Sequence, residues 1–199
     1  MDAATIHPPD SNHSDFSPYN VPYEQLMGKC IASTLPLWKG KRDVSITYSP
    51  IERAPATTLD DLVQFRYASS KPDSTPWKVK GVDTLQTDVE GNGARWKWRG
   101  KGLLKISTSQ WQILGYHLSP SPPSTDTTAL AAAPAEPEWV VTYFSSTLFT
   151  PAGLDIYTRR PDALSDEQVE ELVKKLEGLG ANVEKLVQNG GMFRVPHSS

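Results

Sequence analysis

The feature that most constrains the fold is a series of short runs in which apolar and polar residues alternate. In residues 42–51, apolar side chains at positions 44, 46 and 48 alternate with hydroxyl side chains at 45, 47 and 49. A period of two is typical of a half-buried strand. Seven further runs of similar length follow or precede this one, separated by clusters of Pro, Ser, Gly or Asn. The sequence therefore predicts eight strands between about Gly28 and Arg160.

One segment near the C-terminus has the pattern of an amphipathic helix. Ser165 and Gln168 form a capping box, and apolar residues at 169, 172, 173 and 176 make one stripe, which predicts a helix over 165–178. Residues 183–188 are expected to be extended. The runs 109–118 and 138–147 are apolar on both faces and need cover, which the helix is expected to supply. The predicted fold is all-β: an eight-stranded antiparallel up-and-down β-barrel with one C-terminal α-helix packed outside.

The 199 residues suit a single domain with additional segments at its edges. Residues 1–20 are polar and contain prolines, which predicts a disordered N-terminal tail. The barrel domain is expected over 21–196. Within it, residues 119–137 are rich in Pro, Ser and Ala and are expected to form a flexible loop.

Composition and charge exclude several classes of function. A net charge of −3 provides no basic surface for nucleic acid. Cys30 is the single cysteine, so the chain has no intrachain disulfide and no zinc spacing. The N-terminus lacks the pattern of a signal peptide, and no apolar run reaches the ~18 residues of a membrane span. We expect a cytoplasmic protein with no metal, no cofactor and no membrane span, whose oligomeric state the sequence leaves open.

Two stretches of the sequence resemble a lipocalin. The segment YEQLMGKCIASTLPLWKGKRDVSITYSP is similar to the start of the family's barrel, and IYTRRPDALSDEQVEELVKKLEGLG is similar to its end. The resemblance covers residues 23–188 and is nearest to the bacterial and apolipoprotein-D-like branch of this calycin superfamily. Two family signatures are absent: Gly28-Lys29-Cys30 lacks the tryptophan of the family's G-x-W motif, and the insertion at 119–137 replaces its T-D-Y-like motif.

The resemblance implies binding, transport or storage of a small hydrophobic molecule in the barrel. An alternative is an enzyme of the isomerase or cyclase type acting in the same cavity, and a third is a protein-interaction module with a filled barrel. The resemblance also implies that Arg159 is structural and lies across a tryptophan at the closed end. The residues expected to have structural roles are Gly28, Cys30, Trp96, Trp98 and Arg159.

Aromatic and apolar residues on or near the loops after the first, third, fifth and seventh strands predict the mouth of a pocket. The candidate ligand-binding residues are Trp38, Lys39, Tyr48, Trp77, Trp111, Ile113, Phe144, Leu148 and Phe149. With Lys39, the cations Lys41 and Arg42 are candidates to attract an acidic group of the ligand.

No catalytic motif is present, so an enzyme would have to use scattered acid–base or polarising groups. These are Tyr48, Arg66, Asp83, Arg99, His117 and Tyr143. His117 shares a face with Trp111 and Ile113 if alternation is regular, which predicts that it points inward. A lone inward histidine is more often a core residue than a ligand of metal or haem.

Overall fold

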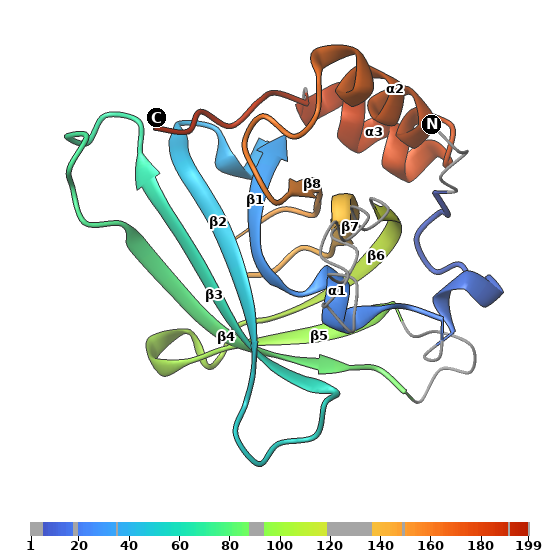
Figure 1. Ribbon diagram of the computed structural model, residues 1–199, viewed down its shortest axis with the longest axis horizontal. Coiled ribbons are helices and arrows are strands. Elements are labelled where there is room, and N and C mark those ends of the chain that lie inside the picture. The colour runs from blue at the N-terminus through green and yellow to red at the C-terminus, as the bar shows by residue number, and fades with distance from the viewer. Residues whose placement is uncertain are drawn as a thin grey trace, which may run out of the picture.

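A computed structural model of the protein describes residues 6–17, 20–34, 36–87, 94–118, 137–148, 150–190 and 192–198. Eight antiparallel strands form a closed barrel, in which each strand pairs with its neighbours in the sequence and the first pairs with the last (Figure 1). The strands are β1 (Gly28–Thr34), β2 (Lys41–Pro50), β3 (Thr58–Tyr67), β4 (Trp77–Leu85), β5 (Arg95–Gly100), β6 (Thr108–Leu118), β7 (Pro137–Phe144) and β8 (Gly153–Thr158). The predicted up-and-down barrel is confirmed.

In the described ranges, three α-helices and three short 3₁₀ helices accompany the strands. The α-helices are α1 (Tyr23–Leu26), α2 (Asp166–Glu177) and α3 (Ala181–Gly190), and the 3₁₀ helices are η1 (Ser14–Phe16), η2 (Pro36–Trp38) and η3 (Gly102–Leu104). The predicted capping box is present at the start of α2, where Ser165 and Gln168 bond each other's backbone. Both C-terminal helices lie outside the strands, α2 packs on α3, and α3 contacts β8 (Figure 1).

The helix α3 corrects the prediction that residues 183–188 are extended. Val183 and Val187 are buried and lie four residues apart, which places them on one face of a helix. The same spacing of Val183 and Val187 is present in the sequence, but two apolar positions in so short a run are also compatible with an extended segment. No helix of the described residues has the length and apolar character needed to cross a membrane.

Residues 6–17 lie packed on the barrel, which differs from the disordered tail expected over 1–20. The amide of His7 donates to the carbonyl of Leu114 over 2.8 Å, and the side chain of Gln112 exchanges hydrogen bonds with Asp10. Phe16 is buried in the same segment. The segment therefore covers part of β6, one of the strands that the sequence marked as apolar on both faces.

The C-terminal residues are held against β2 by the side chain of Asp43. The amide and hydroxyl of Ser198 donate to this carboxylate over 2.6 and 3.1 Å, and Arg66 pairs with it over 3.2 Å. Arg42 also pairs with Asp43. Burial opposes ionisation of Asp43, but the bonds from Ser198 and the two arginine charges outweigh it and lower the pKa of the carboxyl.

A β-bulge in β6 changes which side chains face inward. The pairing with β7 shifts between Ile113 and Gly115, so that His117 stands opposite Trp139. Val140 lines the interior at the closed end, so its neighbour Trp139 points outward. His117 stacks on Trp139 and bonds Glu138 over 3.0 Å. The prediction of an inward His117 is wrong, because one extra residue reverses the alternation.

The predicted loop at 119–137 falls almost wholly outside the described residues, since only Pro137, the first residue of β7, is within them.

Candidate functional site

The barrel encloses a cavity of about 310 Å³. Its mouth lies at the end where η2 joins β1 to β2 and where the β7–β8 connection supplies Thr147 and Thr150. Most of its wall is apolar or aromatic. Residues that line it include Leu37, Trp38, Ile46, Val63, Phe65, Val79, Trp98, Trp111 and Phe144. A volume near the lower end of the usual range for ligand pockets suits a molecule of roughly the size of a small aromatic metabolite.

Two glycines make room for the aromatic rings of this wall. A Cβ atom at position 81 would come within 2.0 Å of Nε1 of Trp98, and one at position 153 within 2.6 Å of Cζ of Phe144. Gly81 and Gly153 are on the inward face of β4 and β8, next to the strands that carry those rings. The rings therefore lie close against the wall and leave the centre of the barrel open.

Three aspartates point into the barrel below this apolar wall. Asp61 on β3 and Asp155 on β8 line the cavity, and Asp83 on β4 lies one step deeper. Their exposed fractions are 7%, 2% and 0% respectively. The indole N–H of Trp111 donates to Asp83 over 2.7 Å, while Asp155 accepts bonds from Trp38 and Tyr157 over 3.0 and 2.6 Å.

The aspartates of the cavity are difficult to ionise. Burial raises the pKa of Asp61 to about 7, against a hydrogen bond from Trp98 that lowers it. Burial also raises the pKa of Asp155 to about 7, although the bonds from Tyr157 and Trp38 act in the other direction. For Asp83, burial and then the charge of Asp61 hold the pKa well above its ordinary value. Carboxyl groups with raised pKa values in a pocket can hold or exchange protons near neutral pH.

Lys41 stands at the rim of the cavity. Its ammonium group donates to the carbonyl of Leu37 over 2.7 Å and lies over the rings of Trp38 and Phe65 at 5.6 and 5.4 Å. Burial lowers the pKa of this lysine. Of its two neighbours considered in the sequence, Lys39 is exposed and Arg42 is paired with Asp43. One cation of that cluster therefore reaches the cavity.

The structure brings together part of the predicted ligand-binding set. Trp38, Tyr48, Trp111 and Phe144 line the cavity. The other members lie elsewhere: Ile113 is at the closed end, Lys39 is on an exposed turn, Trp77 and Leu148 are 61% and 79% exposed, and Phe149 is outside the described residues. Trp77 stands opposite Phe65 at the mouth end of β4, where it packs edge-on against Tyr67 and does not line the cavity.

The groups considered for catalysis are not brought together. Tyr48 and Asp83 are both inside the barrel, and burial followed by the charges of Asp61 and Asp83 raises the pKa of Tyr48. Arg66 bonds Asp43 and the carbonyl of Ser74 near the mouth. The remaining three are separate from this pair: Arg99 bonds the carbonyl of Lys105, His117 faces outward, and Tyr143 alternates with the inward Thr142. Sequence reasoning missed Asp61 and Asp155, although each is a charged residue at an inward position of its strand.

Arg159 occupies the closed end of the barrel. Its guanidinium donates to the carbonyls of Gln25, Met27 and Lys29 over 2.7, 2.6 and 2.9 Å, and one nitrogen lies 3.5 Å from Sγ of Cys30. In the part of the chain that the structure describes, it stacks on no tryptophan. The expectation of a tryptophan partner is therefore wrong.

The two tryptophans expected beside Arg159 lie elsewhere. Trp96 stacks on Trp111 with ring centroids 5.6 Å apart, and Trp98 lines the cavity. With Cys30 at the position of the family's tryptophan, the guanidinium of Arg159 lies against the sulfur and the backbone of the chain before β1. Gly28 adopts a φ of +100° beside the same guanidinium.

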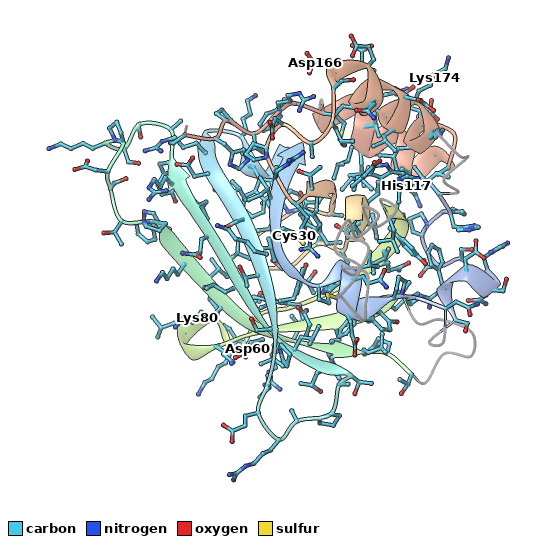
Figure 2. The ribbon with its side chains drawn as sticks, in the orientation of Figure 1. Cys30, Asp60, Lys80, His117, Asp166 and Lys174 are labelled. Carbon is cyan, nitrogen blue, oxygen red and sulfur yellow. The ribbon has the colours of Figure 1, made fainter. Side chains whose placement is uncertain are left out.

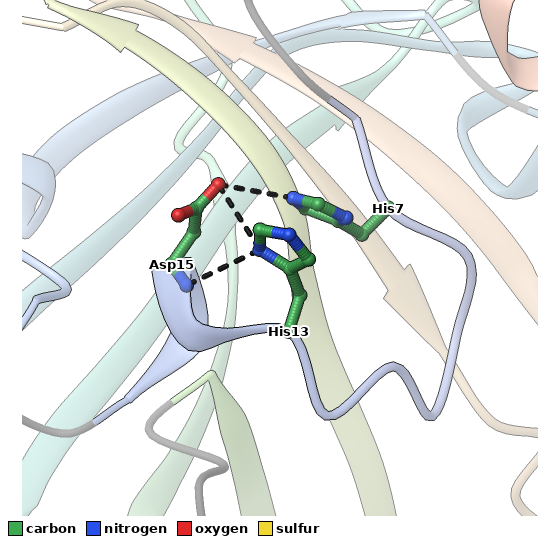
Figure 3. A group of neighbouring side chains, drawn as sticks. All are labelled: His7, His13 and Asp15. Carbon is green, nitrogen blue, oxygen red and sulfur yellow. Dashed lines mark hydrogen bonds and ion pairs between the residues drawn. The ribbon is translucent and has the colours of Figure 1, made fainter.

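A second group of polar side chains lies on the segment that covers β6. Nε2 of His7 and Nδ1 of His13 lie 3.2 and 3.3 Å from the same carboxylate oxygen of Asp15 (Figure 3). The two imidazole rings stack with centroids 4.1 Å apart. These atoms are close enough to be ligands of one metal ion. The carboxylate of Asp15 already contacts both imidazole rings, so these contacts also account for the conformation of the segment without a metal ion.

A larger hollow of about 770 Å³ lies at the closed end, between α1 and the β2–β3 connection. It is bordered by Pro22, Tyr23, Ile51 and Pro55, and none of the three aspartates is among the described residues that line it. We therefore take the smaller cavity within the barrel as the candidate site.

A closed eight-stranded up-and-down barrel with a C-terminal helix is the fold of lipocalins and other calycins, and the fold-level resemblance seen in the sequence is confirmed. The structure is similar to that of lobster apocrustacyanin A1, with a TM-score of 0.56 and 11% identity, over 100% of this chain and 93% of that chain. Apocrustacyanin C2 matches with a TM-score of 0.55, 12% identity and the same coverage. No family model and no curated protein sequence matches the chain. The placement in the bacterial and apolipoprotein-D-like branch stays a prediction.

Proposed function

We propose that the protein binds a small, mostly apolar molecule within its barrel, for transport or storage. The observation that carries this proposal is the cavity of about 310 Å³, which is lined by aromatic and aliphatic side chains and reaches the surface at one end. The lipocalin-type fold supports it. An open cavity also argues against the alternative of a barrel filled with its own side chains. A cytoplasmic location stays a prediction from the sequence.

The direct test is native mass spectrometry of the purified protein, which should reveal a co-purifying small molecule. Trp38, Trp98 and Trp111 line the cavity, so a bound compound should also change the tryptophan emission. A panel of neutral, acidic and basic aromatic compounds would give dissociation constants by this signal.

A pair of variants on β4 would locate the binding. Val79 lines the cavity, whereas Val82 is at a position of opposite parity and faces outward. Val79→Trp should fill part of the cavity and weaken binding at least about tenfold, since the larger side chain occupies volume that the ligand needs. Val82→Trp is the matched control and should bind like the unmodified protein. Equal affinities in both variants would place the ligand outside the barrel and contradict the proposal.

The second candidate function is an isomerase or cyclase, and one observation favours it. Asp61 and Asp83 combine burial with raised pKa values, which would allow a carboxylic acid to donate a proton to a bound substrate. Conversion of a co-purified compound, followed by mass spectrometry over time, separates this function from binding alone.

A further inference from the structure

The floor of the cavity holds two carboxyl groups whose hydrogen bonding is incomplete. Asp61 pairs across the strands with Gly81, and Asp83 lies two residues further along the same inward face of β4. Among the described residues, Oδ1 of Asp61 and Oδ2 of Asp83 are buried and have no hydrogen-bond partner. Buried polar atoms in folded proteins are nearly always bonded. This floor therefore has acceptors that lack donors.

Each of the two carboxyl groups accepts a hydrogen bond at only one of its two oxygens. Trp98 bonds Asp61, and Trp111 bonds Asp83. Asp155 provides an internal comparison in the same cavity, because Trp38 and Tyr157 engage one of its oxygens each. Among the three aspartates of the cavity, the deficit is therefore confined to Asp61 and Asp83.

Among the residues that the structure describes, no cationic side chain compensates the two carboxyl groups. Within the described ranges, Lys41 is the one cationic side chain that lines the cavity, and its ammonium group is bonded to Leu37 at the rim. The other titratable groups that face the floor carry either no charge or a negative one: Cys30 from β1, Tyr48 from β2, and Asp155 and Tyr157 from β8. Asp60, on the outer face of β3, is paired with Lys101.

We propose that the ligand is a small apolar amine, and that its protonated nitrogen binds Asp61 on the cavity floor with Asp83 directly behind it. The inference rests on the proposed binding function and names the chemical class of the ligand. An ammonium group supplies up to three N–H donors and the missing positive charge. The rest of the molecule lies against the apolar wall, which Val63, Phe65 and Val79 contribute. A hard metal ion fits poorly, because it needs about six oxygen ligands.

The test uses three probes of equal length that differ only in their polar end: 4-phenylbutylamine, 4-phenylbutan-1-ol and 4-phenylbutanoate. Calorimetry near pH 7.5 should show that the amine binds at least about tenfold more tightly than the alcohol, and that the acid binds most weakly. Equal affinities for amine and alcohol, or tighter binding of the acid, would overturn the inference and leave the proposed function standing. Failure of all three probes to bind would overturn both.

The release of protons on binding is a second test, and its result does not depend on the stability of the protein. Asp61 is partly protonated near pH 7, so binding of an ammonium ion should release protons, detected as a dependence of the binding heat on the buffer. The alcohol should release none. The affinity for the amine should also rise as the pH increases from about 6 to about 8, while that for the alcohol stays constant. A flat profile for the amine contradicts the proposal.

Matched variants assign the effect to the floor. Asp61→Asn should abolish the preference for the amine and change the affinity for the alcohol by less than about threefold, which also shows that the variant is folded. Asp60→Asn, its outward neighbour, is the control and should keep the preference (Figure 2). Asp83→Asn should reduce the preference partly. Retention of the full preference in Asp61→Asn would overturn the inference.

Discussion

The indole ring of Trp98 lies where a side chain at position 81 would stand. A Cβ atom on Gly81 would be 2.0 Å from Nε1 and 2.5 Å from Cε2 of that ring. The absence of a side chain therefore lets the ring approach the backbone of β4 closely, where it bonds Asp61. The shape and the charge of the cavity floor depend on this contact.

Replacement of Gly81 by alanine should displace Trp98 toward the centre of the barrel. We expect a loss of stability of about 1–3 kcal/mol, because the new methyl group overpacks the wall, together with weaker binding of any ligand. Urea unfolding and a tryptophan-fluorescence titration measure the two effects. Gly178→Ala is the control, since its Cβ would meet its nearest neighbour at an ordinary 3.4 Å. A stable variant with unchanged affinity would contradict the described floor.

Stability should fall as the pH rises from about 4 to about 7. Unfolded Asp61 and Asp155 ionise near the ordinary value of 3.8, whereas burial raises their folded pKa values to about 7. Between these limits the folded state binds more protons, so each group lowers the stability by up to about 1.4 kcal/mol per pH unit. Above about pH 7 the loss should level off.

Urea unfolding at about pH 5 and about pH 8 checks this expectation. Asp61→Asn should make the dependence shallower, since it removes one of the titrating groups. Asp43, whose pKa is lowered, contributes in the opposite sense and in a more acidic range, below about pH 4. Stability that increases between pH 5 and pH 8 would exclude buried, protonated aspartates in the barrel.

Replacement of Arg159 by alanine should destabilise the closed end without affecting the cavity. The variant leaves three backbone carbonyls without their donor, and we expect a loss of about 1–3 kcal/mol. Arg160→Ala is the control, because that side chain is 76% exposed. The measurements are the free energy of unfolding and the affinity for the probe alcohol. A stable Arg159→Ala variant that no longer binds the alcohol would contradict the structural role and indicate that Arg159 contributes to the binding site.

Replacement of Phe16 by alanine should show whether residues 6–17 contribute to the fold. Phe16 is 3% exposed and contacts His7 edge-on, so we expect a loss of about 3 kcal/mol. Ser14→Ala changes an exposed side chain of the same 3₁₀ helix and should have little effect on the stability. Stability equal to that of the unmodified protein would instead support the prediction of a disordered N-terminal tail.

The fold was predictable because its signals are local and repeat. The alternation of apolar and polar residues predicted the strands. The capping box at Ser165 and the apolar stripe at 169, 172 and 176 predicted α2. The segment that forms α3 is ambiguous in the sequence because two buried apolar positions and a half-buried one in ten residues are compatible with a strand or a helix, and only the packing against α2 selects the helix.

The site was predictable in part. The aromatic residues Trp38, Trp111 and Phe144 followed from the barrel plan, but the outward direction of His117 did not, because a bulge reverses the alternation within β6. The carboxyl groups of Asp61 and Asp155 were overlooked because acidic residues in half-buried strands ordinarily face water. Only the closed barrel shows that alternation turns them inward.

The contact between residues 6–17 and β6 has a consequence for the order of folding. Asp10 and its partner Gln112 are separated by 102 positions, so the N-terminal segment is synthesised long before its docking surface exists. Its apolar side chains cannot dock until β6 has been synthesised and paired with its neighbours. Contacts between residues so far apart in the sequence form slowly. Docking of this segment should therefore be a late step, after the strands have closed, and the outer face of β6 stays accessible to other chains until then.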